Sequence, residues 1–309
     1  MKVFLCETIH PAAVSLLKEH GEIISDREHM GEADALISRV IAVGKAEMDA
    51  MPKLKVIAVH GTGTDAVDLR EAERRGIRVV YAPHLNANAV AELNVALLLS
   101  VMRKTVYARR LIDGGENREM AALQKELRGF ELRGKTAGFV GLGAIGGRTA
   151  EILGRGFGMK CTAWSRSLTE ERAAAHGCTC AADLDEVFTT SDVVFLSLPL
   201  TERTRNLADR NRLQSMKQGA VLVNASRAGL VDEEALLEAL KSGHLSGAAT
   251  DVLREELPGP DHPLLQQPNF VVTPHIGANT EEALYEVGMC CARQILDVLA
   301  GKEAEYPVV

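Results

Sequence analysis

A glycine run between an apolar stretch and a helical pattern constrains the fold of this chain more than any other feature. The run GLGAIG (141–146) follows the apolar residues TAGFV and opens the helical pattern GGRTAEILGRGFG. Gly141, Gly143 and Gly146 would allow a tight turn, a close backbone approach to a pyrophosphate, and close packing of helix on strand. The free N–H groups at the start of such a helix attract phosphate. The run therefore predicts a dinucleotide-binding βαβ unit.

The residue expected to select the nucleotide is absent from its usual position. Units of this kind carry an acidic residue about 20 positions after the glycines, where it binds the ribose hydroxyls of NAD. Ser165 stands there, after the apolar run 159–164, and Arg166 and Ser167 follow it. A guanidinium beside two hydroxyls suits a 2′-phosphate, which a carboxylate would repel. We predict NADP(H) as cofactor, with NAD possible; the alternative is that Arg166 is a solvated loop residue without a ligand.

Short apolar runs alternate with helical patterns along almost the whole chain, which favours parallel α/β units. The predicted strands are 2–6, 22–25, 33–38, 54–61 and 78–83 in the first third, and 136–141, 159–164, 192–199, 220–226, 247–252 and 270–275 in the second half. A long helical pattern (88–115) has no Pro or Gly until its end, so we expect it to carry the chain from one domain to another. A final helix is expected over 280–301.

Composition excludes several classes of function. The net charge of −7 provides no basic stripe, so we expect no nucleic-acid partner. The longest apolar segment (94–102) is too short to span a bilayer, and the N-terminus lacks the pattern of a signal peptide. Cys178-Thr-Cys180 is not a C-x-x-C pair and has no histidine pair at ligand spacing. We expect reduced thiols, no metal site, no membrane partner and a cytoplasmic protein.

Polar residues follow three of the strands predicted in the second half of the chain. Arg227 follows the run 220–226, Asp251 and Glu256 lie at and beyond the end of 247–252, and His275 ends the run 270–275. Ligands of open α/β sheets bind at the carboxyl ends of the strands, so these side chains could converge on one cleft. An arginine would bind a carboxylate, and a histidine with a carboxylate partner would move a proton beside a nicotinamide.

Taken together, these residues resemble the D-isomer-specific 2-hydroxyacid dehydrogenase family. The likeness extends along essentially the whole chain and is carried by stretches such as GKTAGFVGLGAIG (134–146), LVNASRAGLVDEEAL (222–236) and VVTPHIGANTEEA (271–283). The resemblance implies two Rossmann-like domains. A doubly wound, parallel-sheet cofactor domain would span 96–280, and a smaller flavodoxin-like substrate domain would span 1–95 and 281–309. It also implies a homodimer joined through the cofactor domain.

The resemblance implies a role for individual residues of this chain. Arg227 would anchor the substrate carboxylate, Glu256 would partner the histidine, and His275 would be the acid/base. The backbone N–H groups of Gly61, Thr62 and Gly63 would bind the same carboxylate. The implied cofactor contacts are Gly141, Gly143, Ala144, Ile145, Gly146, Ser165, Arg166, Ser167, Pro199, Thr204, Ala225, Asp251 and Gly277.

The reaction expected from the resemblance is hydride transfer between NADP(H) and a small 2-oxo acid or D-2-hydroxy acid, such as glyoxylate or hydroxypyruvate. Similar WSRS tips occur in NADPH-dependent glyoxylate/hydroxypyruvate reductases. His84-Leu85 stands where Gly-Ala is frequent in the family, and Leu257 replaces an expected proline.

Other functions stay open at this point. Arg39, His60, Tyr81 and His84 fall near the cleft loops of the first domain, where a phosphoglycerate-type enzyme would need a cationic phosphate site. No second arginine stands in those loops, so we expect unphosphorylated acids. Formate dehydrogenase is disfavoured because its histidine pairs with a glutamine. A non-catalytic NAD(P)-sensing binding protein is a further alternative.

Overall fold

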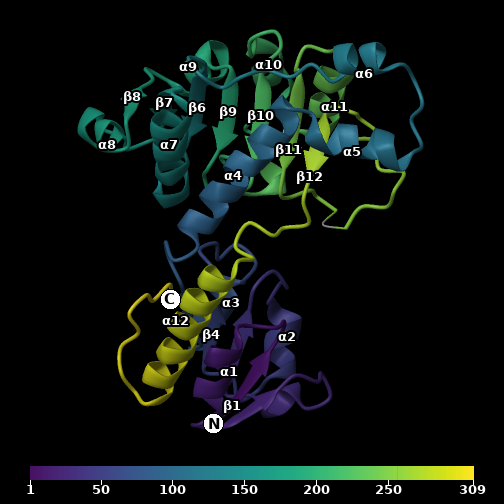
Figure 1. Cartoon of the computed structure of the whole chain (residues 1–309). Helices are drawn as coiled ribbons and strands as arrows, with labels where there is room; N and C mark the ends of the chain where they lie inside the picture. The colour runs from purple at the N-terminus through teal and green to yellow at the C-terminus, as the bar shows by residue number, and fades with distance from the viewer. Residues whose placement is uncertain (256) are drawn as a thin grey trace. The chain divides into compact units, whose positions relative to one another are not determined.

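The computed structural model describes residues 1–255 and 257–309, which fold into two compact α/β units (Figure 1). Unit 1 comprises Met1–Ala89 and Ala278–Val309, and unit 2 comprises Val90–Gly277. Helix α4 (Ala87–Met102) begins in unit 1 and continues into unit 2. The expected boundaries, after residues 95 and 280, lie a few residues further along the chain. The predicted α/β class with two parallel sheets is confirmed.

Unit 1 is built on a parallel sheet with the order β2-β1-β3-β4-β5, the flavodoxin-like order. Its strands are β1 (Lys2–Leu5), β2 (Glu22–Ile24), β3 (Ala35–Ser38), β4 (Val56–Val59) and β5 (Arg78–Tyr81). Its helices are α1 (Pro11–Lys18), the 3₁₀ turn η1 (Met30–Glu32), α2 (Lys45–Ala50), α3 (Leu69–Arg74) and α12 (Glu281–Leu299). Helices α1 and α12 cover one face, and α2 and α3 cover the other. Because both faces are covered, the strands are mostly apolar, as buried parallel strands are.

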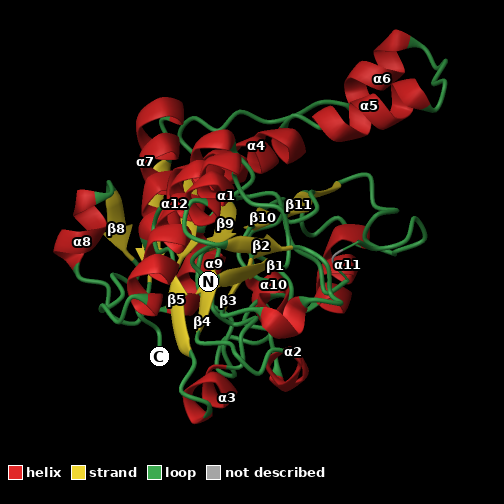
Figure 2. Ribbon diagram, turned by 90° about the horizontal axis from the view of Figure 1, so that it is seen from below, coloured by secondary structure: helices red, strands yellow, loops and turns green. Residues whose placement is uncertain are grey.

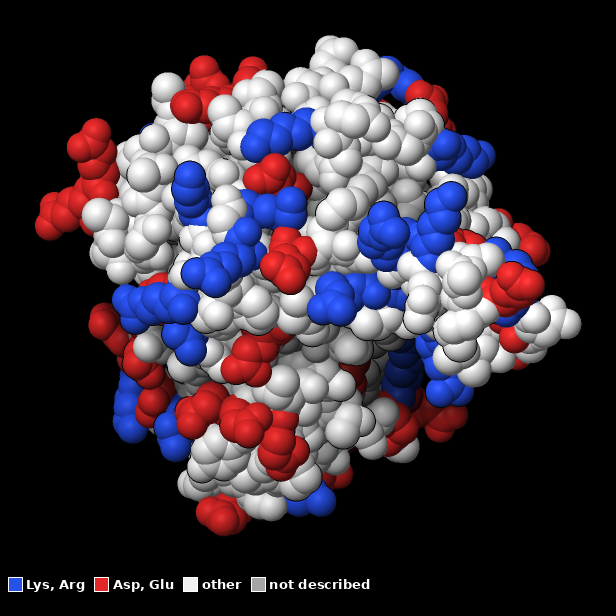
Figure 3. Space-filling view, turned by 45° about the horizontal axis from the view of Figure 1, so that its top comes forward, with Lys and Arg blue, Asp and Glu red and all other residues white. Residues whose placement is uncertain are grey.

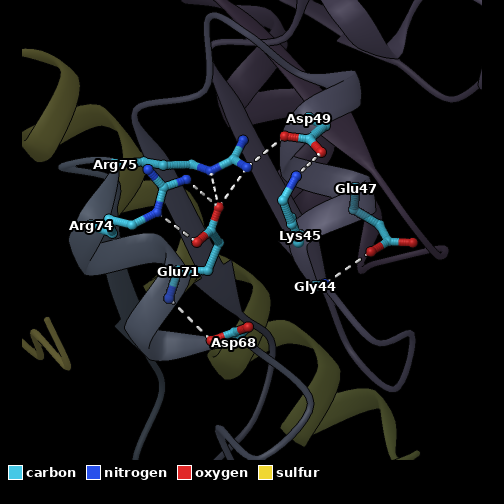
Figure 4. A network of polar contacts seen from close by, with 8 residues as sticks. All are labelled: Gly44, Lys45, Glu47, Asp49, Asp68, Glu71, Arg74 and Arg75. Carbon is cyan, nitrogen blue, oxygen red and sulfur yellow. Dashed lines mark hydrogen bonds and ion pairs between the residues drawn. The ribbon is translucent and has the colours of Figure 1, made fainter.

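An ion-pair network fastens α3 to α2 on the surface of unit 1 (Figure 4). The guanidinium of Arg75 contacts both Asp49 and Glu71, and Arg74 makes two hydrogen bonds to Glu71. The two arginines hold the pKa of the Glu71 carboxyl down at about 2. Asp68 caps α3 by accepting from the backbone N–H of Glu71 at 3.0 Å. The network connects the two helices, although surface pairs of this kind contribute little stability individually.

Unit 2 contains a seven-stranded parallel sheet with the order β12-β11-β10-β9-β6-β7-β8. Its strands are β6 (Thr136–Val140), β7 (Lys160–Trp164), β8 (Cys178–Cys180), β9 (Val193–Leu196), β10 (Val221–Asn224), β11 (Gly247–Thr250) and β12 (Phe270–Val272). This is the Rossmann order with a seventh strand, and the direction of winding switches between β6 and β9. The six strands predicted here form, but the edge strand β8 was missed. It is only three residues long, and it pairs with β7 alone among the described residues.

Helices cover both faces of this second sheet. They are α7 (Ala144–Phe157), α8 (Glu170–Ala175), α9 (Leu184–Thr190), α10 (Arg210–Ser215), the 3₁₀ turn η2 (Ala228–Leu230) and α11 (Glu233–Lys241). Helices α4, α7 and α8 share one core with the sheet, and α9, α10 and α11 share the other. Because the strands between the two helix layers are parallel, their carboxyl ends all lie at the same edge of the sheet.

The prediction of one helix over 88–115 was wrong. The helix stops at Met102, and Lys104 takes a left-handed φ of 53° before α5 (Thr105–Asp113) begins. The carbonyl of Met102 accepts instead from the N–H of Phe130, at 3.0 Å, on a returning segment. That segment contains α6 (Met120–Glu126), which lies beside α5 and away from the sheet (Figure 2). Neither α5 nor α6 has a buried residue.

The surface carries acidic and basic side chains together. Figure 3 shows Lys and Arg interspersed with Asp and Glu over the face drawn. No helix within the described residues is long and apolar enough to cross a membrane. All six cysteines are free thiols, and no cluster of three or more potential metal ligands occurs among the described residues.

Candidate active site

The glycine run forms a tight turn at the switch point of the unit 2 sheet. Gly141, just after β6, has a φ of 96°, and a Cβ there would lie 2.2 Å from the carbonyl oxygen of Ser197 after β9. Gly146 lies in the first turns of α7, and a Cβ there would lie 2.4 Å from the carbonyl oxygen of Gly141. Neither position has room for a side chain, so both glycines are needed to bring helix, turn and strand together.

Gly143 differs from its neighbours in the run. It is exposed, caps the N-terminus of α7, and has a φ of −87° that other residues adopt readily. A Cβ at this position would meet nothing within 4 Å. The protein itself therefore does not explain this glycine, whereas a phosphate brought against the N–H groups of Ala144 and Ile145 would. The turn fits the pyrophosphate of a dinucleotide.

The segment after β7 forms a turn whose tip faces solvent. The N–H of Leu168 donates to the carbonyl of Ser165 at 3.1 Å, and Arg166 and Ser167 between them are exposed. Arg172 on α8 donates to the carbonyl of Ser167 at 3.4 Å. The tip therefore carries two hydroxyls and a guanidinium that has no partner among the described residues, beside β6 and its glycine turn.

Arg227 and His275 line one pocket of about 430 Å³ at the carboxyl ends of the unit 2 strands. Asn224, the last residue of β10, accepts from the N–H of Ser226 at 3.1 Å and donates to the carbonyl of Arg227 at 2.9 Å. The hydroxyl of Ser226 donates to the carbonyl of Leu196 on β9, at 3.0 Å. These bonds fix the backbone from which the half-buried Arg227 reaches the pocket.

His275 is held by a buried carboxylate. Asp251, only 1% exposed, accepts from the hydroxyl of Thr273 at 2.6 Å and from the N–H groups of Ile276 at 2.8 Å and Gly277 at 2.7 Å. His275 lies inside this loop with a left-handed φ of 54°, and its N–H donates to the carbonyl of Asp251 at 2.8 Å. Both carboxylate oxygens of Asp251 therefore bind the loop, a positioning contact that the sequence did not reveal.

Three other predicted cofactor contacts lie on loops of the same edge. The hydroxyl of Thr204 donates to the carbonyl of Pro199 at 2.8 Å, which closes the loop after β9. Ala225 follows β10 directly and is half-buried. Glu256, the expected partner of the histidine, lies outside the described residues.

Two cationic residues in the pocket were not predicted. Arg205 and Arg254 line it together with Arg227 and His275. The guanidinium of Arg254 donates to the side-chain oxygen of Asn206 at 2.8 Å. Arg205 is exposed, and its guanidinium has no partner among the described residues. The two side chains come from separate loops, so their convergence has no signal in the sequence.

The predicted anion loop lies in unit 1, directly after β4. Gly61 has a φ of 158°, and its carbonyl accepts from Ala82 after β5, at 3.0 Å. The hydroxyl of Thr62 donates to Asn86 at 3.0 Å, and Gly63 is half-buried. His60, before the loop, is only 7% exposed, and burial lowers the pKa of its imidazole to about 4.

The other candidates from unit 1 have mainly structural surroundings. Arg39 donates to the carbonyl of Thr8 at 3.4 Å, and the ring of Tyr81 packs edge-on against Tyr306. His84 has a left-handed φ of 68°. This conformation favours glycine, the residue that the resemblance to the family led us to expect at this position.

Unit 2 contains a Rossmann sheet with a glycine turn at its switch point. A pocket lined by arginine and histidine lies at the same edge. These features define a dinucleotide-binding protein of the α/β class. Residues 95–277 match the model of the D-isomer specific 2-hydroxyacid dehydrogenase NAD-binding domain. The chain belongs to this family.

Named relatives agree with that assignment. The chain is 37% identical to glyoxylate reductase from Thermofilum pendens, covering 97% of this chain and 92% of the relative. It is also 37% identical to D-3-phosphoglycerate dehydrogenase from Methanocaldococcus jannaschii, covering 100% of this chain but 59% of that protein. This chain thus spans about three fifths of the phosphoglycerate dehydrogenase. The crystal structure of Aquifex aeolicus D-lactate dehydrogenase with NAD and lactic acid superposes with a TM-score of 0.86 at 25% identity, covering 100% of this chain and 99% of that one.

Proposed function

We propose that the protein transfers a hydride between NADP(H) and a small 2-oxo acid or D-2-hydroxy acid, with glyoxylate and hydroxypyruvate as the first candidates. The observation that carries the proposal is the pocket shared by Arg227 and His275 at the ligand edge of a Rossmann sheet. The bound nicotinamide supplies or accepts the hydride. Arg227 binds the substrate carboxylate and polarises the adjacent carbonyl. His275 gives its proton to the carbonyl oxygen in reduction and takes it back in oxidation, and Glu256 is assigned as its partner.

Replacement of His275 tests this assignment. His275→Asn should abolish most 2-oxo acid-dependent consumption of NADPH, because no other group in the pocket is assigned to move the proton. NADPH binding, followed by energy transfer from Trp164, the single tryptophan, should stay near the wild-type value. His29→Asn is the matched control, since His29 is an exposed residue paired with Asp26. Unchanged turnover in His275→Asn would remove the histidine from the mechanism.

The cofactor preference is assigned to the tip formed by Ser165, Arg166 and Ser167. A 2′-phosphate at this exposed tip would receive a bidentate guanidinium and two hydroxyl hydrogen bonds. Arg166→Ala should raise the KM for NADPH at least tenfold and change that for NADH little. Lys160→Ala removes a cation from the other end of the same strand and is the control. An equal loss for both cofactors would make Arg166 a fold residue.

A second candidate, a phosphorylated 2-oxo acid, is favoured by one specific observation. Arg205 and Arg254 add cationic side chains to the pocket that contains Arg227. The similarity to a phosphoglycerate dehydrogenase points the same way. The two candidates are separated by comparing kcat/KM for hydroxypyruvate and its phosphate ester, in the wild type and in the Arg205→Ala/Arg254→Ala double variant. A preference for the ester that the double variant loses would select the second candidate.

We also infer a homodimer joined through unit 2. Helices α5 and α6 have no buried residue, and Ile112 and Met120 are 73% and 67% exposed. A second copy covering this surface would remove apolar area from water. Sedimentation should give a dimer for the wild type and a monomer for the double variant Ile112→Asp/Met120→Asp. A monomeric wild type at micromolar concentration would contradict the inference.

The assigned compartment is the cytoplasm. Six free thiols, four of them buried, suit a reducing environment, where disulfides do not persist. Fractionation of cells expressing the full protein is the test, and recovery with secreted or membrane fractions would contradict the assignment.

A further inference from the structure

Two cysteines face each other at the edge of the unit 2 sheet. The register of the parallel pair β7·β8 places Cys161 directly opposite Cys178. Both belong to the core shared with α7, and the thiol of Cys161 lies 3.6 Å from the carbonyl oxygen of Ala150 on that helix. The two side chains are therefore on the same face of the sheet, at directly opposed positions.

The spacing of this pair suits a covalent bond. Neighbouring parallel strands lie about 4.7–4.9 Å apart, and disulfides join residues whose Cα atoms are about 4.4–6.8 Å apart. Strand β8 is three residues long and forms the edge of the sheet, so it can shift toward β7 without disturbing another strand. Interaction with the neighbouring Cys178 lowers the pKa of the Cys161 thiol, whereas interaction with Cys161 and burial raise the pKa of Cys178. Cys161 therefore loses its proton more readily than Cys178 does.

The chain between these two cysteines contains the whole tip assigned to the nucleotide. It runs from β7 through Ser165, Arg166 and Ser167, then through α8, and returns along β8. A bond between Cys161 and Cys178 would tie together the two ends of this segment. We propose that Cys161 and Cys178 are a redox-active pair, which a peroxide converts to a cross-strand disulfide that locks segment 161–178.

The chemistry balances with hydrogen peroxide as the oxidant. The Cys161 thiolate attacks one peroxide oxygen, the O–O bond breaks, and the departing hydroxide takes a proton to leave as water. The sulfenic acid on Cys161 is then attacked by the sulfur of Cys178. The S–S bond forms as the S–O bond breaks, and the proton of Cys178 leaves with the second water. Two thiols and one peroxide give one disulfide and two waters, and an added dithiol reverses the change.

Both thiols are only 6% exposed, so oxidation requires a transient opening of the edge. A three-residue edge strand followed by a loop is a segment that opens locally at low cost. Cys180, two residues along β8 on the same face, is half-buried and is the competing thiol. The experiment must therefore distinguish Cys178 from Cys180.

Peptide mapping of the purified full chain distinguishes them. Trypsin releases Cys161 in peptide 161–166 and both other cysteines in peptide 173–203. Peroxide treatment should give a linked pair of these peptides in the wild type and in Cys180→Ser, and no such pair in Cys178→Ser or Cys178→Ala. Absence of the linked peptides from the wild type, or their persistence in both Cys178 variants, would overturn the pairing.

Restricted opening of segment 161–178 by the disulfide is measured separately. Native cleavage by trypsin after Arg166 and Arg172 should be at least tenfold slower in the oxidised wild type than in the reduced form, because the closed segment opens less often. Oxidised Cys178→Ser should show no such protection. The dissociation constant for NADPH should fall at least twofold in the oxidised wild type. This last expectation rests on the proposed function, whereas disulfide formation and protection from trypsin do not. Equal cleavage rates in the oxidised and reduced wild type would overturn the lock.

Discussion

Gly143 and Gly146 should respond in opposite ways to the same substitution, alanine. A Cβ at Gly146 would lie 2.4 Å from the carbonyl oxygen of Gly141 and 3.2 Å from the Cβ of Ser197. The first is a backbone atom and the second is bonded directly to the backbone, and both lie just past the ends of the central strands, so the helix must move by about an ångström. Overpacking of this kind costs about 1–3 kcal/mol. Gly146→Ala should therefore lower the free energy of unfolding of unit 2 by that amount.

Gly143→Ala should leave the stability almost unchanged. The backbone conformation is open to alanine, and the new methyl would meet no protein atom within 4 Å. Surface changes of this kind alter the free energy of unfolding by about 0.5 kcal/mol or less. The methyl would instead occupy the space that we assign to the pyrophosphate, so NADPH binding should weaken at least tenfold, or about 1.4 kcal/mol.

The assays are urea unfolding for stability and energy transfer from Trp164 to NADPH for binding. Each variant is the control for the other, because the same methyl is added three residues apart on one turn. Two results would contradict these assignments of the glycines. If Gly143→Ala binds NADPH as well as the wild type does, the pyrophosphate does not approach this turn. If Gly146→Ala unfolds at the wild-type urea concentration, the close helix–strand contact is not required.

Two further predictions concern buried ionisable residues. The pKa of His60 is about 4 in the folded chain, against an ordinary value of 6.5, so the unfolded chain binds a proton first as the pH falls. The stability that the neutral ring contributes is complete above about pH 6.5, and the free energy of unfolding should fall by about 3 kcal/mol between pH 6.5 and 4. In urea titrations, His60→Gln should lose correspondingly less free energy of unfolding over this pH range. An identical pH profile for the variant and the wild type would contradict the burial effect. Asp251→Ala should lower the free energy of unfolding by about 2–4 kcal/mol, because three donors lose a charged acceptor. It should also lower kcat through the displaced His275, so a variant with wild-type stability and kcat would show that the loop is held by other contacts.

The sequence predicted the parts of the fold that depend on local pattern. The tight turn at Gly141 and the close helix–strand packing at Gly146 form as predicted, whereas the pyrophosphate contact of Gly143 stays a prediction. The strand ends carrying Arg227 and His275 were also placed correctly at one edge, because parallel strands oblige their carboxyl ends to lie together.

Features that depend on distant contacts could not be predicted. The break at Lys104 follows from the capture of a carbonyl by Phe130, which lies far along the chain. Strand β8 is too short for a recognisable alternation, and its formation depends on pairing with β7. Asp251 looks like a ligand contact in the sequence, and only the fold brings Thr273 and Gly277 onto its two oxygens.

The proposed activity is the NADP(H)-dependent reduction of small 2-oxo acids. It is tested most directly by the loss of reduced-nicotinamide absorbance with hydroxypyruvate, comparing kcat/KM for NADPH and NADH. We expect turnover, with a clear advantage for NADPH. Faster turnover with NADH would contradict the role given to Ser165, Arg166 and Ser167. Binding of either cofactor without turnover of any 2-oxo acid would contradict the catalytic role of Arg227 and His275.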